Sequence, residues 1–188
     1  MTASRSYNEV ARLHEQLREL GFSQDISDTR HLHRWKTPDG DIVDLVPAGN
    51  HLGGTGQEWD AAALETRVAL QVDDGLVIYH ASAPAFPALK WAAHNDRGSG
   101  DPLASHDLED ILALIAARPT IVEEVASAPE NVRAYVARQA RALLSDAAFE
   151  DLAAGHLNNA QDPPRTIERV RTRLGGLAGD FEDLLDRD

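Results

Sequence analysis

An aspartate set in an apolar run is the residue of this sequence best suited to chemistry. Asp44 lies between Val43 and Leu45 in the run Asp41–Pro47, DIVDLVP. Burying an unpaired carboxylate costs several kcal/mol, and strands that end at an active site often present such an acid to a divalent metal. Asp41, three residues earlier, would lie on the opposite strand face and belongs to the preceding turn. Asp44 is therefore a candidate catalytic residue and metal ligand, and an aspartate on the solvent face of a hairpin is the alternative.

One lysine and two aspartates form a second candidate group. Lys90 lies on an otherwise apolar predicted helix, where its ammonium either extends to solvent, the favoured interpretation, or faces an anion. Asp107 and Asp110 are spaced i, i+3 and are neighbours on one helix face. These paired acids either bind a metal or hold Lys90 and Arg97 in place through ion pairs. We adopt the second, structural interpretation.

Several other patterns carry weaker signals. The loop Gly53–Gly56 has the glycine content of a phosphate-binding loop but lacks a following Lys-Ser or Lys-Thr, so we interpret it as a flexible connection or lid, with phosphate binding as the lesser alternative. His31 and His33 share one predicted strand face, yet no third ligand has convincing spacing. His106 directly precedes Asp107, an arrangement typical of helix capping.

The first half of the chain supplies hairpins to position these residues. Apolar spacing predicts a helix over residues 7–20, which Gly21 ends. Strands are expected over residues 31–37, 41–47, 66–72 and 76–81. Pro-Asp-Gly at 38–40 and Asp-Asp-Gly at 73–75 join them into two hairpins. The apolar residues of the run 41–47 predict a strand buried on both faces.

Helical periodicity dominates the rest of the sequence. One helix begins at Ala85, and Ser105 is expected to cap the next. Further helices are predicted over residues 106–117, 120–126, 129–144, 146–154, 166–174 and 181–185. Residues 95–101 are expected to form a loop, and residues 158–164 form a polar connection that contains proline.

Composition narrows the classes of protein that fit. The 188 residues carry a formal charge of −13, so the chain lacks the overall basic character of a nucleic-acid or anionic-membrane binder. There is no cysteine, which excludes disulfides, zinc-thiolate sites and cysteine nucleophiles. No apolar run approaches the roughly 20 residues of a membrane span, and the N-terminal residues contain no apolar signal core. We therefore expect a cytoplasmic protein with no membrane partner.

The order of these segments resembles a known family. The stretch LKWAAHNDRGSGD that runs into SHDLEDILALI, together with the hairpin WKTPDGDIVDLVP, resembles bacterial nucleotidyltransferase-fold proteins of the AbiEii/AbiGii toxin type. The resemblance covers roughly residues 7–157. It implies that Asp44 is the third metal-binding carboxylate of the fold, that Lys90 contacts the triphosphate with Arg97 nearby, and that Asp107 and Asp110 order the pocket.

The sequence also departs from that family pattern. The family's enzymes have a Gly-Ser motif followed by an Asp-x-Asp strand, whose carboxylates hold the metals, and this sequence contains no such combination. Either a short N-terminal piece is missing, or the protein is a shortened relative that has lost transferase chemistry. Asp44 alone would hold two Mg²⁺ ions poorly.

These observations together define the expectations. The fold class is α+β, with a small mixed or antiparallel nucleotidyltransferase-like sheet and flanking helices in residues 1–83 and a helical region in residues 84–188. The resemblance implies a toxin of a toxin–antitoxin pair that transfers a nucleotide from a nucleoside triphosphate to an RNA or protein hydroxyl. It implies Mg²⁺ or Mn²⁺ as the metal and tRNA or a cognate antitoxin as partner. In this form the transfer is expected to be weak or absent. The alternative is a non-catalytic nucleotide-binding or protein-interaction module on the same fold, and a further alternative is an acidic helical binding protein with no link to nucleotides. An incomplete sheet would expose an edge strand, which predicts a homodimer or instability.

Overall fold

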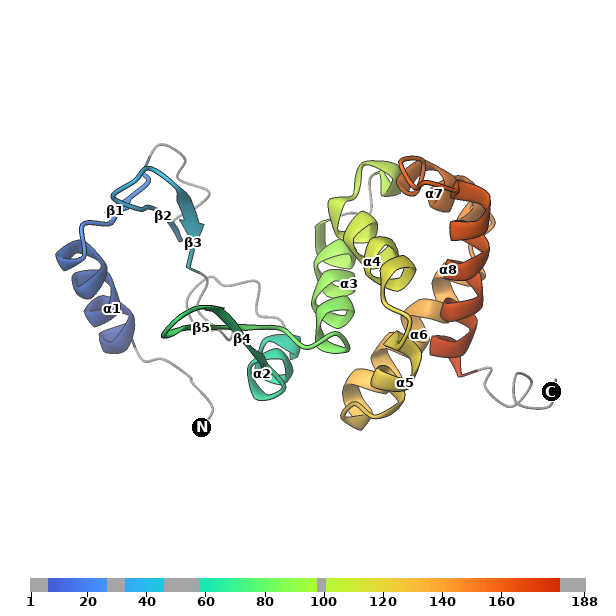
Figure 1. Cartoon of the computed structure of the whole chain (residues 1–188), viewed down its shortest axis with the longest axis horizontal. Coiled ribbons are helices and arrows are strands. Elements are labelled where there is room, and N and C mark those ends of the chain that lie inside the picture. The colour runs from blue at the N-terminus through green and yellow to red at the C-terminus, as the bar shows by residue number, and fades with distance from the viewer. Residues whose placement is uncertain (1–6, 27–32, 46–57, 98–100, 180–188) are drawn as a thin grey trace. The chain divides into compact units, whose positions relative to one another are not determined.

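The chain forms two compact units, Met1–Ala61 and Ala62–Asp188. The computed structural model in Figure 1 describes residues 7–26, 33–45, 58–97 and 101–179. This division falls earlier than the boundary expected between residues 83 and 84. The second hairpin and all of the helical region therefore belong to the second unit.

The first unit combines one helix with a small antiparallel sheet of order β1-β2-β3. Its elements are α1 (Tyr7–Glu19), β1 (Ser23–Gln24), β2 (Arg34–Lys36) and β3 (Ile42–Asp44). The predicted hairpin is confirmed, with Trp35 opposite Val43. The side chain of Trp35 is fully buried, and its ring lies 5.0 Å from that of His14 on α1. This tryptophan joins the helix to the sheet.

Two glycines shape this unit as the sequence predicts. Gly21 has φ +85° and ends α1, where the amide of Phe22 donates to the carbonyl of Leu17. Gly40 has φ +94° in the turn between β2 and β3. The prediction that the strand over residues 41–47 is buried on both faces is wrong, because Ile42 is 58% exposed and Asp44 is exposed as well. A three-stranded sheet with one helix leaves its edge strand in contact with solvent.

The second unit begins with a hairpin and continues as packed helices. The helix α2 (Glu58–Glu65) spans the division between the units. The strands β4 (Val68–Asp73) and β5 (Leu76–His80) pair in antiparallel fashion around Gly75, which has φ +81°. The remaining elements are α3 (Ala85–Arg97), the 3₁₀ turn η1 (Pro102–Ala104), α4 (His106–Ala117), α5 (Ile121–Ala126), α6 (Glu130–Leu144), α7 (Phe149–His156) and α8 (Pro163–Ala178).

The core of the second unit is built around α4. Contacts join α4 to α3, α7 and α8, and join α6 to α8 (Figure 1). Four buried side chains of α4 lie at helical spacing, Leu108, Ile111, Leu112 and Ile115. Val170 and Leu174 of α8 are also fully buried. Burial of this kind is the main source of stability in a helical unit.

The coarse fold class is confirmed: the structure is α+β, with two small antiparallel sheets and a helical C-terminal region in its described residues. Several predicted boundaries differ: α3 continues to Arg97, α7 is Phe149–His156 where residues 146–154 were expected, and α8 is Pro163–Ala178 where residues 166–174 were expected. The glycine loop Gly53–Gly56, His31 and the helix expected over residues 181–185 lie outside the described residues. No described helix combines the length and the apolar character that crossing a membrane requires.

Candidate functional site

Asp44 lies at the end of β3 with its carboxylate on the solvent side. The guanidinium of Arg34, directly opposite on β2, donates to both carboxylate oxygens of Asp44, from Nε at 2.9 Å and from Nη2 at 3.0 Å. Such a two-point ion pair fixes both side chains in one plane. The side chain of Asp44 is 45% exposed, so the pair is a surface interaction.

The described surroundings of Asp44 do not form a site for a divalent cation. Mg²⁺ and Mn²⁺ need several oxygen ligands converging on one point. Among the residues that the structure describes, no three His, Cys, Asp or Glu side chains gather in that way. Both oxygens of Asp44 already accept from Arg34. We therefore derive no chemical step through a metal at this position.

Lys90 lies between two carboxylates of α4. Its Nζ is 2.6 Å from Oδ2 of Asp110 and 3.2 Å from Oδ1 of Asp107. The i, i+3 spacing places both acids on the face of α4 that packs against α3. The predicted ion pairing of Lys90 with these two aspartates is thus present.

Electrostatics hold Lys90 in its charged form. Burial lowers the pKa of Lys90, but hydrogen bonds and charge from Asp110 and Asp107 outweigh burial, so the pKa is raised. A lysine held by two carboxylates has little positive charge left for a phosphate. A ligand that used Lys90 would first have to displace both aspartates.

The N-terminus of α4 brings a histidine to the same region. Ser105 caps α4, and its Oγ accepts from the amide of Leu108 at 3.3 Å. The same Oγ lies 2.7 Å from Nδ1 of His94. Burial lowers the pKa of His94, and the nearby His156 lowers it further. The negative charge of Asp107 raises this pKa, but the net result is a pKa below the ordinary value. The hydrogen bond between His94 and Ser105 links α3 to the start of α4.

The five residues singled out from the sequence belong to different parts of the structure. Lys90, Asp107 and Asp110 meet in the second unit. The backbone of Arg97 ends α3, and its side chain lies outside the described residues. Asp44 belongs to the first unit.

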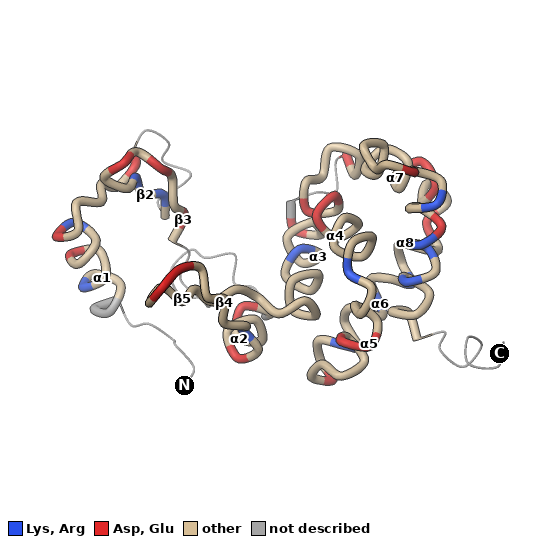
Figure 2. Tube along the Cα trace, in the orientation of Figure 1, with Lys and Arg blue, Asp and Glu red and all other residues tan. Residues whose placement is uncertain are grey.

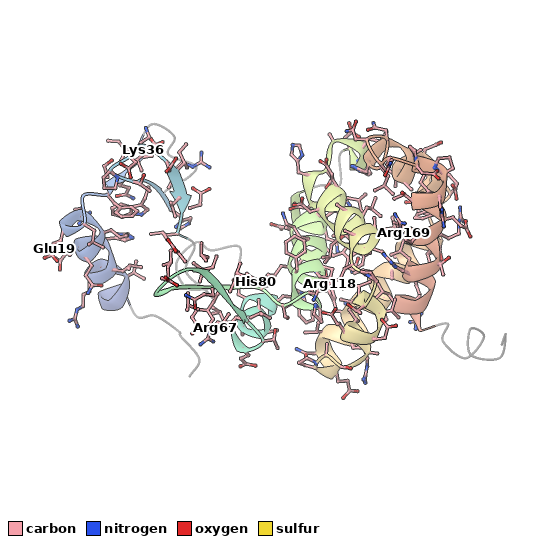
Figure 3. The ribbon with its side chains drawn as sticks, viewed as in Figure 1. Glu19, Lys36, Arg67, His80, Arg118 and Arg169 are labelled. Atoms are coloured by element: carbon pink, nitrogen blue, oxygen red, sulfur yellow. The ribbon has the colours of Figure 1, made fainter. Side chains whose placement is uncertain are left out.

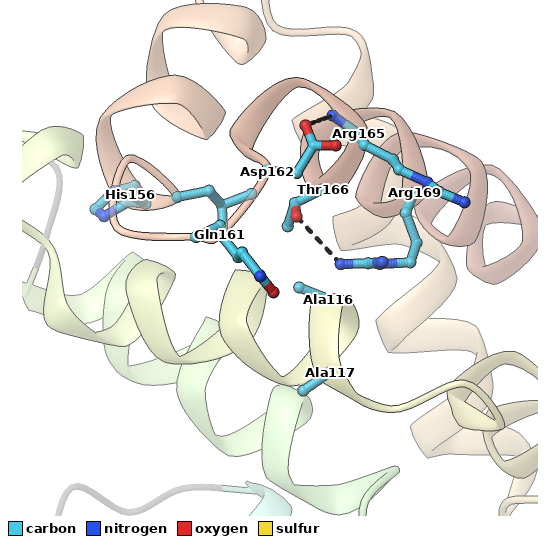
Figure 4. Close-up of a pocket in the computed structure, with 10 residues that line it drawn as sticks. Ala116, Ala117, His156, Gln161, Asp162, Arg165, Thr166 and Arg169 are labelled. Carbon is cyan, nitrogen blue, oxygen red and sulfur yellow. Dashed lines mark hydrogen bonds between the residues drawn. The ribbon is translucent and has the colours of Figure 1, made fainter.

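A pocket of about 750 Å³ opens elsewhere in the second unit, between α4, α7 and the start of α8 (Figure 4). The guanidinium of Arg169 extends across the pocket near Ala116, and its Nη2 donates to Oγ1 of Thr166 at 3.1 Å. The other lining residues are Ala117, His156, Leu157, Ala160, Gln161, Asp162 and Arg165. Sequence reasoning pointed to none of these residues.

Local sequence explains why α8 begins at this pocket. The carboxylate of Asp162 accepts from the amide of Arg165 at 3.3 Å and caps the helix. Pro163 and Pro164 occupy the first two helical positions, where a missing N–H costs nothing. The signal was available, because Asp-Pro-Pro followed by arginines at i and i+4 marks a helix start with a basic face.

The lining suits an anion that also carries an apolar part. Arg165, Arg169 and Asp162 are among the lining residues, so the formal charge of these three residues together is positive. Alanine and leucine side chains provide an apolar wall. A second pocket, of about 550 Å³, is lined by Glu123 and Glu124 with mainly apolar neighbours, a composition that repels anions.

Comparison with known proteins adds no family to this picture. Scans of the chain against protein-family models, curated proteins and solved structures found no significant match. The function is therefore argued from the residues and their geometry.

Proposed function

We propose that this chain is a nucleotidyltransferase-type protein that binds a nucleotide without transferring it, and that the nucleotide occupies the pocket between α4, α7 and α8. The observation that carries the proposal is Arg169, whose guanidinium extends across that pocket (Figure 4). The proposal corresponds to the non-catalytic alternative that the sequence leaves open.

The size and lining of the pocket support a nucleotide over a smaller anion. Small-molecule sites span roughly 300–1,000 Å³ and are mostly apolar with a few placed polar groups. At about 750 Å³ the pocket exceeds the needs of inorganic phosphate. Arg165 and Arg169 would bind phosphate oxygens, because a guanidinium donates in pairs. The alanine wall would pack against the base or the sugar, and Gln161 supplies polar atoms for its edge.

The pairing of the family-type residues supports binding without transfer. Asp44 is held by Arg34, and Lys90 is held by Asp107 and Asp110. Nucleotidyl transfer needs metal charge at the bridging oxygens of the triphosphate. In the part of the chain that the structure describes, neither group is arranged to supply it.

Binding is tested by calorimetric titration of the full chain with ATP, GTP, CTP and UTP, each with and without Mg²⁺. We expect saturable binding of at least one nucleotide. Arg169→Gln removes a charged donor and should raise the Kd by roughly tenfold. Arg138→Gln is the matched control, because Arg138 is an exposed arginine on α6 that does not line the pocket, and it should leave the Kd within about twofold.

Transfer is tested separately with labelled nucleoside triphosphates, pooled tRNA and either Mg²⁺ or Mn²⁺. We expect no incorporation above background for the wild-type chain and for Asp44→Ala. Incorporation that Asp44→Ala abolishes would replace the binding proposal with the metal-dependent reaction of the toxin family. If no nucleotide binds, or if Arg169→Gln binds it as tightly as the wild type, the pocket is not a nucleotide site.

The proposal places the chain in the cytoplasm, where nucleoside triphosphates are abundant. A cognate antitoxin or a tRNA remains part of the wider proposal that the family resemblance supplies. The calorimetric experiment does not depend on either partner.

A further inference from the structure

The second pocket, of about 550 Å³, lies in the second unit and shares no described lining residue with the proposed nucleotide pocket. It is lined by residues that follow α2, that precede α3, and that form α5 and its connection to α6. Its volume falls within the roughly 300–1,000 Å³ of small-molecule sites. The nucleotide proposal uses none of these residues, so the chemistry of this pocket can be read separately.

The apolar wall of the second pocket is made of proline, alanine and valine. Ala85 and Val132 are buried. Pro84 and Pro129 have no backbone N–H, so neither residue can donate a hydrogen bond from its main chain. A wall of this kind packs against hydrocarbon and gains little from a polar group. A ligand of this pocket therefore needs an apolar part.

The hydroxyl groups beside α2 and α3 offer a ligand acceptors but no donors. A serine or threonine hydroxyl carries a single proton. Oγ1 of Thr66 donates its proton to the carbonyl of Ala62 at 2.8 Å. In the 2.8 Å bond between Oγ1 of Thr66 and Oγ of Ser82, Ser82 is therefore the donor. The lone pairs that remain on Oγ of Ser82 can only accept.

The two hydroxyls on the α5 side are committed in the same way. Oγ1 of Thr120 donates to Oε1 of Glu124, and Oγ of Ser127 donates to the carbonyl of Glu123 at 2.9 Å. All four hydroxyls of the described lining thus give their protons to acceptors of the protein. The lone pairs that they leave for a ligand suit a group with N–H donors.

Both charged residues of the described lining are acidic. Hydrogen bonds from Arg118 and Thr120 outweigh burial and lower the pKa of Glu124, so Glu124 is ionised. Arg118, labelled in Figure 3, follows the last residue of α4 and is not among the residues that line the pocket. Glu123 is exposed and forms no ion pair with a described residue. Its charge acts on Arg173 of α8, which binds carbonyls of α4 instead. The lining therefore favours a cation.

We propose that the second pocket binds a small organic cation, a primary ammonium group attached to an apolar body. An ammonium has three N–H donors and no acceptor, which matches a lining that offers carboxylates and lone pairs. We assign Ser82 and Glu123 to the ammonium, and Pro84, Pro129 and Val132 to the apolar body. This inference is independent of the proposed nucleotide site.

An NMR titration of the full chain with benzylammonium at neutral pH tests the proposal. We expect saturable shifts of the amide signals of Thr66, Ser82 and Ser127. Benzyl alcohol has the same ring without the charge and should bind at least about tenfold more weakly, and benzoate should not bind there. Methylammonium keeps the charge without the ring and should also bind at least about tenfold more weakly.

Two variants and a matched control test the residues assigned to the ammonium. Glu123→Gln keeps the size of the side chain, removes its charge and should raise the Kd of benzylammonium about fivefold. Ser82→Ala removes an acceptor and should raise the Kd by roughly the same factor. Glu109→Gln makes the charge change at an exposed glutamate of α4 outside the lining and should leave the Kd within about twofold.

Circular dichroism verifies that each variant is folded, and Glu123→Gln alone decides if Ser82→Ala does not fold. Weaker binding by either variant, with Glu109→Gln unchanged, supports the proposal. The proposal is overturned if benzylammonium causes no shift of these amide signals at concentrations up to about 20 mM. It is also overturned if benzyl alcohol binds as tightly as benzylammonium, or if every folded variant keeps the Kd of the wild type.

Discussion

His94 and Lys90 occupy neighbouring turns of α3 and respond to their surroundings in opposite ways. Burial lowers the pKa of both side chains. The two carboxylates beside Lys90 reverse that effect, whereas Asp107 does not reverse it for His94. The result is a charged lysine beside a neutral histidine. Each holds α3 to α4 by a different kind of bond.

The neutral state of His94 predicts a dependence of stability on pH. Its folded pKa lies below the ordinary value of 6.5, so the unfolded chain binds the proton more readily than the folded chain. Stability from this residue is fully present above the unfolded pKa and is lost as the pH falls through the folded value. We expect Tm to fall between about pH 7.5 and about pH 5, and His94→Gln to reduce that fall.

His106→Gln is the control for this measurement. The side chain of His106 is 94% exposed at the start of α4, so removing it should keep the wild-type pH dependence. Parallel Tm curves for the wild type and His94→Gln would show that the half-buried His94 has no influence on acid stability. An NMR titration of the His94 ring should give a midpoint below that of an exposed histidine.

Sequence reasoning about individual residues succeeded where the partner was local. The ion pair of Lys90 with Asp107 and Asp110 follows from helix spacing and from the charge of the segment. The two-point pair of Asp44 with Arg34 was missed, because it depends on the register of a hairpin. Arg169 was missed because its role depends on how α4, α7 and α8 pack, which no spacing in one helix reveals.

At the scale of elements, Arg173 connects α8 to the end of α4. Its Nη1 donates to the carbonyl of Ile115 at 2.6 Å and to that of Ala116 at 2.8 Å. These carbonyls belong to the last turn of α4, where helix geometry leaves acceptors unpaired. The bond also fixes the wall of the pocket, because Ala116 lines it.

Arg173→Met tests this connection. The variant keeps the aliphatic part of the side chain and removes the donor, so two carbonyls of α4 lose their partner. We expect a loss of about 2 kcal/mol in the free energy of unfolding, measured by urea denaturation. Arg138→Met, an exposed arginine of the same unit, should cost less than about 0.5 kcal/mol. Equal stability of the two variants would contradict the bridging role of Arg173.

The elements themselves follow from the sequence to a large extent. Turn glycines at 40 and 75 and the cap at Ser105 act locally, so the hairpins and α4 are placed correctly. The strand β1 was missed, because two residues, Ser23 and Gln24, pair only once β2 is present. The sequence predicts a polar connection over residues 158–164, whereas Asp162 and the two prolines after it begin α8. Local signals therefore predict element type better than element ends.

At the scale of the whole molecule, the chain is acidic, but positive charge is concentrated on α8. The chain carries −13, yet four of its 18 basic residues lie on α8 (Figure 2). Arg171 forms ion pairs with Glu150 and Glu168. Arg165 and Arg169 line the pocket instead and form no ion pair among the described residues. The protein is acidic overall but has a local basic site at this pocket. Its net negative charge does not attract anions over long distances, so the arginines act only on an anion that is already at the pocket.

Amide hydrogen exchange of the full chain, with and without a saturating nucleotide and Mg²⁺, tests whether the nucleotide binds in the pocket between α4, α7 and α8. If the nucleotide binds there, we expect slower exchange in residues 156–169, which include the last residue of α7 and the first turns of α8. We expect unchanged exchange around Asp44 and Lys90, whose charges already have partners. Slower exchange confined to residues 34–44 and 86–110, with no change in residues 156–169, would contradict binding in this pocket.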